Sequence, residues 1–176
     1  MDTEKMAGDL FAPAAKANAA EEIPAGITLA EALQMRSDVQ KRIAQLKARL
    51  MDNSKVQEGE KPAEDPLTLV ALLKSDIALY DELIRRINRT NAQTVDGECT
   101  LTDLLARRDS LGLYTSVMRE FLQAASQRVD RFTRTEIKIE STVDVPSLQK
   151  GVDAASRELR QLDARIQRLN WNTLLK

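Results

Sequence analysis

Histidine is absent from the 176-residue sequence, and cysteine occurs once, at Cys99. Without histidine, neither a Cys/His zinc site nor a histidine-dependent catalytic triad can form. A single cysteine excludes a disulfide within the chain, which fits a reducing compartment, and we expect a cytoplasmic protein. Any acid–base chemistry would therefore fall mainly to carboxylates, lysine or tyrosine.

Aromatic residues and glycine are also scarce, at 3% of the residues and six residues respectively. This disfavours a β-sandwich and favours helices built from Leu, Ala, Arg, Glu and Gln. The formal net charge is −1, so no overall field draws the chain to nucleic acid or to an anionic membrane. No apolar run reaches the length of a transmembrane helix. We therefore expect neither nucleic acid nor a membrane among the partners.

Composition divides the chain into two parts. Residues 1–27 are rich in alanine and in small or charged residues, with breaks at Pro13, Pro24 and Gly26. This composition predicts a flexible N-terminal arm, or alternatively an arm that docks on a neighbouring subunit. Residues 28–176 form the predicted helical bundle domain.

The first two predicted helices begin at recognisable caps. Thr28 and Glu31 have the spacing of a capping box, and apolar residues recur at helical spacing to about residue 52. Asp65 and Pro66 are a favourable start for a second helix, which fades near residue 91.

The last two predicted helices follow a turn at Asp96–Gly97. Thr100 and Asp103 open the third, which carries one broad apolar stripe. Pro146 opens the fourth. Its apolar residues step by four and three without interruption, as in a coiled-coil seam: Leu148, Val152, Ala155, Leu159, Leu162, Ile166 and Leu169. Trp171, the only tryptophan, is expected to plug one end of the bundle, with ligand stacking as the alternative.

Residues 135–145 depart from the helical pattern. Ile137 and Ile139 alternate with charged residues, which predicts a short extended or β segment. A single strand leaves its backbone edges unpaired, so the segment needs a hairpin partner or another subunit.

The expected fold is an all-α, antiparallel four-helix bundle of long amphipathic helices, with this extended segment and the flexible arm added to it. Several apolar residues fall off the main stripes and indicate a second buried face: Leu33, Leu72, Leu83, Leu104 and Phe121. We therefore expect a homo-oligomer.

Six short motifs together resemble a known family. They are KVQEGE (55–60), INRTN (87–91), ARRD (106–109), EIK (136–138), VDV (143–145) and LNW (169–171). Over roughly residues 28–175, the chain resembles a family of small, helical, uncharacterised bacterial proteins, some of which are named septicolysin. The resemblance implies a helical bundle that self-associates, with no known function. The toxin activity in that name is not expected, because a β-pore needs long amphipathic strands and this chain has one short candidate.

Polar residues within the stretch LIRRINRTNAQT, residues 83–94, are the core of the candidate site. Arg36 and Arg108 fall on the apolar stripes of other helices, and a desolvated arginine is costly unless it is paired. One interpretation is an internal network that fixes helix register or subunit pairing. The other is a pocket for a small anionic ligand, or a carboxylate-based metal-dependent enzyme site.

The candidate ligand-binding residues are Lys55, Glu58, Arg86, Asn88, Arg89, Asn91, Arg108, Asp109, Arg134 and Glu136. Glu58 and Glu60, with Asp38 or Asp109, are oxygen donors of the kind that Mg²⁺ and Ca²⁺ prefer. However, the sequence contains no EF-hand loop and no HExxH motif, so we predict no metal site. The sequence therefore assigns neither a reaction nor a cofactor.

Overall fold

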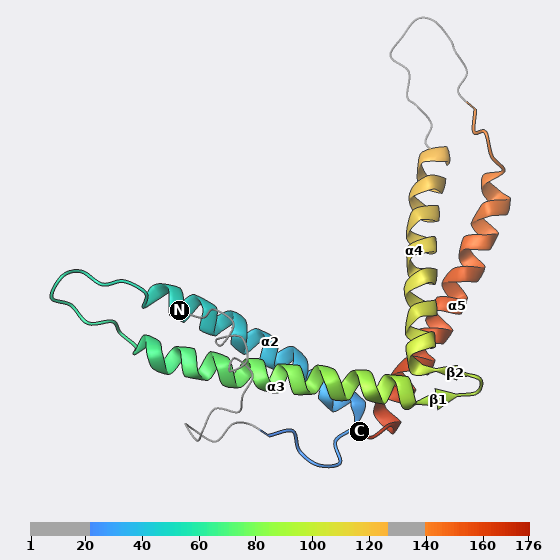
Figure 1. Ribbon diagram of the computed structural model, residues 1–176. Coiled ribbons are helices and arrows are strands. Elements are labelled where there is room, and N and C mark those ends of the chain that lie inside the picture. Colours follow the sequence, from blue (N-terminus) through green and yellow to red (C-terminus); the bar gives the residue numbers. More distant parts are fainter. Residues whose placement is uncertain (1–21, 127–139) are drawn as a thin grey trace, which may run out of the picture. The chain divides into compact units, whose positions relative to one another are not determined.

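The computed structural model describes residues 22–126 and 140–176, and these contain four long helices and two short strands (Figure 1). The helices are α2 (Leu29–Asp52), α3 (Pro66–Gln93), α4 (Leu101–Ser126) and α5 (Val145–Asn172). The strands β1 (Val95–Asp96) and β2 (Cys99–Thr100) pair in antiparallel fashion. The predicted helical fold with four helices is confirmed. The predicted helix starts lie within about one residue of the observed ones, and the predicted ends of the first two helices within two residues.

The chain folds as two compact units. The first ends at Gln93 and also takes in Asn170–Lys176, and the second comprises Thr94–Leu169. Each unit is built on a pair of helices with its own apolar interior. The packing of all four helices into one bundle stays a prediction, as does the boundary of the arm at residue 27.

In the first unit, α2 begins with the predicted capping box. Thr28 Oγ1 accepts a hydrogen bond from Glu31 N at 3.2 Å, and the Glu31 carboxylate accepts from Thr28 N at 2.7 Å and from its hydroxyl at 2.8 Å. These bonds lower the pKa of Glu31. An ionised carboxylate in the first turn also stabilises the helix through its dipole.

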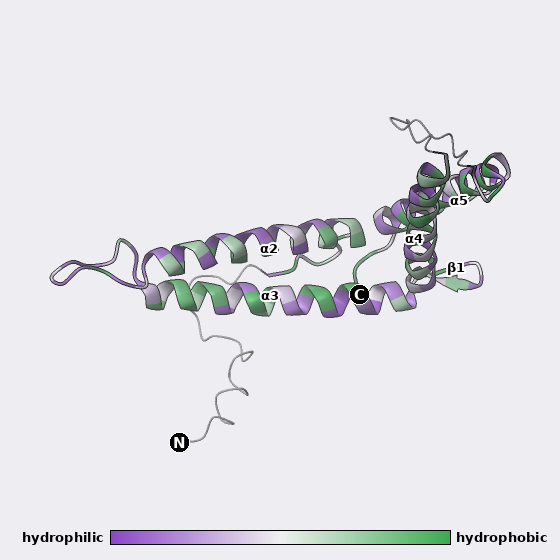
Figure 2. Ribbon diagram, turned by 90° about the horizontal axis from the view of Figure 1, so that it is seen from above, coloured by the Kyte–Doolittle hydropathy of each residue, from purple (hydrophilic) through white to green (hydrophobic). Residues whose placement is uncertain are grey.

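The helices α2 and α3 run side by side in Figures 1 and 2, and each of them buries apolar residues. The buried residues are Leu29, Ala32, Val39 and Leu46 of α2 and Leu69, Leu83 and Ile87 of α3. Each buried leucine, isoleucine or valine side chain contributes about 1.5–3 kcal/mol relative to an exposed one. Two polar pairs fix the antiparallel register at the edge: Gln40 Nε2 donates to the Tyr80 hydroxyl at 2.7 Å, and Arg42 Nη2 donates to Asp76 at 2.9 Å.

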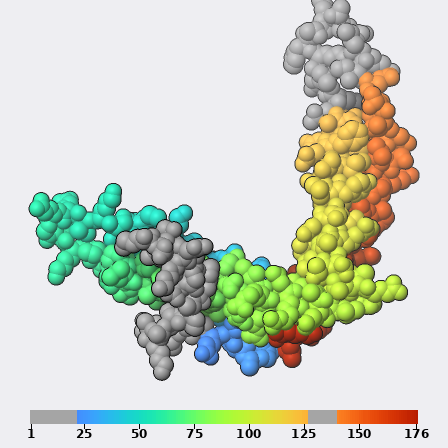
Figure 3. Space-filling view, viewed as in Figure 1, coloured from blue at the N-terminus to red at the C-terminus, as the bar shows by residue number. Residues whose placement is uncertain are grey.

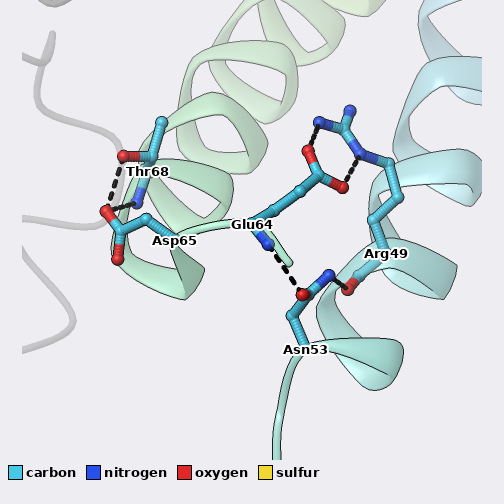
Figure 4. A network of polar contacts seen from close by, with 5 residues as sticks. All are labelled: Arg49, Asn53, Glu64, Asp65 and Thr68. Atoms are coloured by element: carbon cyan, nitrogen blue, oxygen red, sulfur yellow. Dashed lines mark hydrogen bonds and ion pairs between the residues drawn. The ribbon is translucent and has the colours of Figure 1, made fainter. Parts of the chain in front are cut away.

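A polar network closes the far end of this helix pair (Figure 4). The buried side chain of Asn53 donates to the Arg49 carbonyl and accepts from Glu64 N, both at 2.9 Å. The Arg49 guanidinium also pairs with both oxygens of the Glu64 carboxylate. Next to it, the Asp65 carboxylate accepts from Thr68 N at 3.1 Å and from the Thr68 hydroxyl at 2.6 Å, which caps the start of α3.

The second unit begins with a tight hairpin. Gly97 has a φ of 69°, a backbone conformation that favours glycine. The turn predicted at Asp96–Gly97 is therefore confirmed, whereas the two strands beside it were not predicted. Arg165 of α5 holds the hairpin, because its Nη2 donates to the Asp96 carbonyl at 2.8 Å and its Nε pairs with the Asp96 carboxylate. This guanidinium lowers the pKa of Asp96.

Within the second unit, polar side chains join α4 to α5, and both helices bury apolar residues. Every position of the predicted seam in α5 is buried or half-buried, with Val152, Leu162 and Ile166 the most buried. Arg119 Nη2 donates to the Ser156 hydroxyl at 2.9 Å, and Arg107 Nη2 donates to Glu158 at 3.0 Å.

The prediction of an extended segment at 135–145 is wrong for the part that the structure describes. Residues 140–144 form no strand, and α5 already begins at Val145. The Asp144 carboxylate accepts a hydrogen bond from Ser147 N at 3.2 Å, and this cap, with proline in the first turn, starts a helix. Residues 135–139 lie outside the described residues.

We expect Thr28→Ala to lower the free energy of unfolding by about 1 kcal/mol, because it removes the hydroxyl that caps α2. Urea denaturation followed by circular dichroism measures the change. Thr102→Ala, at an exposed position of α4, is the matched control. Equal effects of the two substitutions would contradict a specific capping role.

From the Asp96–Arg165 pair we predict that the stability of the folded protein depends on pH. Because the pKa of Asp96 is lower in the folded protein, its contribution to stability is complete above its unfolded pKa, about 3.9, and is lost as the pH falls through the lower folded value. We expect Asp96→Asn to flatten the fall in stability below about pH 4. Thermal unfolding at several pH values, in wild type and variant, measures this, and parallel curves would contradict it.

Candidate functional site

The last residues of the chain pair with the start of α2 in the first unit. Leu29 N donates to the Thr173 carbonyl at 2.8 Å, and Leu175 N donates to the Ile27 carbonyl at 2.9 Å. Between these bonds, Thr28 and Leu174 form an antiparallel bridge. Figure 3 shows the red C-terminal residues beside the blue residues that precede α2. Main-chain hydrogen bonds thus join two segments from opposite ends of the described chain.

Two residues of α3, one helical turn apart, hold the same C-terminal segment. Arg86 donates from Nε to the main-chain oxygen of Lys176 at 3.2 Å and from Nη2 to that of Leu175 at 3.5 Å. The hydroxyl of Thr90 donates to the Arg86 carbonyl at 2.8 Å and accepts from Lys176 N at 2.9 Å. We call Ile27–Leu29, Arg86, Thr90 and Thr173–Lys176 the C-terminal clamp.

The C-terminal clamp accounts for two polar side chains of LIRRINRTN, those of Arg86 and Thr90. Thr90 is fully buried. It was not among the candidate residues predicted from the sequence, although it lies four residues after Arg86, a spacing that puts two side chains on one face of a helix. Asn88 and Arg89 are exposed and Asn91 is half-buried. The candidate residues of this stretch therefore fan out around α3 and do not converge on one point.

Lys55 and Glu58 lie elsewhere in the first unit. Both are exposed in the loop between α2 and α3, which projects beyond the ends of the two helices (Figure 1). Asn88 lies 22 residues after the first residue of α3, or about 33 Å along the helix axis. The structure therefore does not bring this loop to Arg86 and Asn88.

The remaining candidate residues divide between the second unit and the residues that are not described. Arg108 is half-buried in α4, and its guanidinium donates to the neighbouring Asp109 carboxylate at 2.7 and 3.0 Å. Arg134 and Glu136 lie outside the described residues. The predicted cluster is thus spread over both units.

Arg36 differs from Arg108, the other arginine that falls on an apolar stripe. It is half-buried in α2, and its Nε is buried without a hydrogen-bond partner among the described residues. A buried donor without an acceptor costs about 1–3 kcal/mol. This Nε–H is therefore an unsatisfied donor within the first unit.

A groove of about 400 Å³ lies on the outer side of α2, also in the first unit. It is lined by Ala30, Glu31, Gln34, Met35, Asp38, Arg42 and Trp171. Trp171 is 62% exposed, so the prediction that it plugs a bundle end is wrong for the described residues. The sequence did not reveal the groove, because Trp171 and the α2 residues lie far apart along the chain.

The charged side chains of the groove have partners of their own. Asp38 accepts from Lys41 Nζ at 2.9 Å and from Gln34 Nε2 at 3.1 Å, and these bonds lower its pKa. Arg42 pairs with Asp76. At neutral pH the carboxylates of Glu31 and Asp38 are therefore both ionised.

Two features of residues 22–126 and 140–176 bear on possible chemistry. Nowhere in these ranges do three or more acidic or cysteine side chains gather as they would around a metal ion. None of the helices described is both long and apolar enough to cross a membrane.

Paired helices, a short β hairpin and the C-terminal clamp define a helical protein of two units. Residues 36–175 match the model of a family of unknown function, DUF6847, and the chain belongs to this family. It is also similar to a crystal structure described as a functionally unknown conserved protein from Corynebacterium diphtheriae. The two chains are 41% identical with a TM-score of 0.80, and the match covers 86% of this chain and 99% of the other. None of the curated proteins matches.

These comparisons confirm the expectation of an uncharacterised family with a helical fold. Neither description carries the name septicolysin, so that part of the resemblance is not supported.

We expect Thr90→Val to lower the free energy of unfolding by about 1–3 kcal/mol, since Lys176 N loses its acceptor inside the C-terminal clamp. Arg86→Gln should weaken the same segment. Hydrogen exchange at the Leu175 and Lys176 amides measures the local effect. Arg85→Gln is the matched control, because Arg85 forms exposed pairs within its own helix that contribute at most about 0.5 kcal/mol. Unchanged exchange in both clamp variants would show that the C-terminal clamp is not stabilising.

Proposed function

We propose that this protein is a homo-oligomeric helical scaffold whose copies associate through an apolar face of α4. The observation that carries the proposal is a group of large apolar side chains exposed on one side of this helix. Leu113 is 69% exposed, Val117 54%, Tyr114 47% and Phe121 42%. Large exposed apolar patches on folded proteins commonly mark interaction sites.

The exposed residues lie well away from the face of α4 that is buried. At about 100° per residue, the four exposed side chains span about 100° of the helix, centred about 125° from Leu104, Leu111 and Leu122. Those three leucines are buried within the second unit. The helix α4 is therefore apolar on two faces, and its own unit covers one of them.

The spacing of the outer face fits a helix partner. Ala106, Ser110, Leu113, Val117, Phe121 and Ala124 follow one another in steps of four, three, four, four and three residues. Such spacing is typical of helices that pack along a seam. The row holds no charged residue, so two identical faces can meet about a two-fold axis without burying an unpaired charge. A net charge of −1 adds little repulsion between copies.

In this proposal, three arginine side chains of the second unit hold the helices that present the face. Arg107 and Arg119 join α4 to α5, and Arg165 joins α5 to the hairpin that precedes α4. A rigid helix loses less conformational freedom on association than a mobile one. A cytoplasmic location, as expected from the single cysteine, fits such a scaffold.

One observation favours a second candidate function, the binding of a small anion. The Arg36 guanidinium is half-buried and its Nε lacks an acceptor among the described residues. A phosphate or carboxylate would supply one. Nuclear magnetic resonance of the arginine Nε–H groups during a phosphate titration tests this candidate, and an unchanged Arg36 signal would remove it.

We expect Leu113→Glu combined with Val117→Glu to convert the oligomer into a monomer, because each copy would place two charges in the apolar contact. Sedimentation velocity at tens of micromolar protein measures the change. Ser116→Glu combined with Gln123→Glu is the matched control, since it adds the same charge to α4 at exposed positions off this face.

Circular dichroism must show equal helicity in both double variants. A wild-type protein that sediments as a monomer, or a control variant that dissociates as fully as the test variant, would contradict the proposal.

A further inference from the structure

The groove on α2 belongs to the first unit, and none of its residues takes part in the proposed contact through α4. Its volume of about 400 Å³ falls within the range of small-molecule sites, about 300–1,000 Å³. It combines an exposed indole with two carboxylates.

The apolar part of the groove centres on Trp171. Its side chain is 62% exposed, although tryptophan contributes strongly to stability when it is buried. Ala30 and Met35 of α2 line the same groove. The face of an indole attracts a cation more strongly than that of any other side chain, when the cation lies within about 6 Å of the ring.

The polar part of the groove is negative. Glu31 and Asp38 lie seven residues apart, two turns along one face of α2. Both Thr28 donors bond to a single oxygen of Glu31, Oε2, while Lys41 partly neutralises Asp38. Because Arg42 is paired with Asp76, the lining residues and their direct partners retain one net negative charge.

Three backbone donors at the start of α2 that could attract an anion are already occupied. Leu29 N donates to the Thr173 carbonyl, Glu31 N to the Thr28 hydroxyl, and Ala32 N to the Thr28 carbonyl. These are N–H groups of the first turn of α2, where anions commonly bind. The groove therefore favours positive charge.

From these features we propose that the groove beside Trp171 binds a small organic cation, an ammonium or guanidinium group on an apolar body. The charged head lies between the indole and the carboxylates of Glu31 and Asp38. The apolar body covers Ala30 and Met35. Arg42 and its partner Asp76 close the far end of the groove and limit the length of the ligand.

Trp171 is the only tryptophan, so its fluorescence reports on this groove directly. The experiment titrates the full chain with butylguanidinium and butylammonium, and with butyrate and butanol as anionic and neutral compounds of similar size. We expect a saturable change in emission with the two cations, weakened by added salt. A change that is equally large with butanol or butyrate, or no saturable change with either cation up to about 50 mM, would overturn the proposal.

Charge-removing variants locate the site. We expect Glu31→Gln and Asp38→Asn each to weaken binding about threefold, and the double variant about tenfold. Asp52→Asn, at an exposed position near the end of α2 and outside the groove, is the matched control and should bind as the wild type does.

Circular dichroism checks that the capping variant Glu31→Gln keeps its helicity. If Glu31→Gln does not fold, Asp38→Asn, which leaves the cap of α2 intact, tests the site by itself. Wild-type affinity in Asp38→Asn, or equal weakening in the control, would show that the cation does not bind between these carboxylates. The oligomeric state is measured in parallel, so this proposal and the α4 contact succeed or fail separately.

Discussion

The short main-chain pairing between Ile27–Leu29 and Thr173–Leu175 is the constraint on which the first unit depends. It satisfies the N–H of Leu29 at the start of α2 and buries Leu175, and it brings Lys176 N to the buried hydroxyl of Thr90. Arg86 adds its guanidinium to the same main-chain oxygens. Backbone groups away from water need partners, and here each segment supplies them for the other. Within the run of arginine and asparagine at residues 85–91, Arg86 is thus the side chain that holds this backbone.

Local signals in the sequence predicted the helices well. The capping residues Thr28 and Asp65 and the unbroken apolar steps of α5 all lie within a few residues of the structure they determine. The same local logic failed at residues 140–145, because the extended segment predicted from Ile137 and Ile139 was carried on to Val145, whereas Asp144 caps a helix there. It also missed β1 and β2, because strands of two residues are too short to show alternation.

Interactions between segments far apart in the chain could not be predicted from the sequence, for a physical reason. Nothing near Thr173 or Leu175 indicates that these residues pair with the start of α2, and Trp171 gives no sign that it will line a groove with Glu31 and Asp38. The predicted polar cluster grouped residues by type and by motif, whereas a helix turns about 100° at each residue and directs neighbours to different sides. Of the polar residues in this stretch of α3, Arg86 and Thr90, four residues apart, both bond to the C-terminal segment.

The division of the chain has a consequence for how it folds during synthesis. Because the first unit takes its final segment from Asn170–Lys176, the 76 residues of Thr94–Leu169 form an insertion within it. That insertion is continuous and can complete its own interior as soon as it has left the ribosome. The α2–α3 pair emerges earlier yet must wait for the last residues to close its edge, and such non-local closure is slow because chain entropy opposes it. The edge of the α2–α3 pair is therefore completed only when residues 170–176 join it.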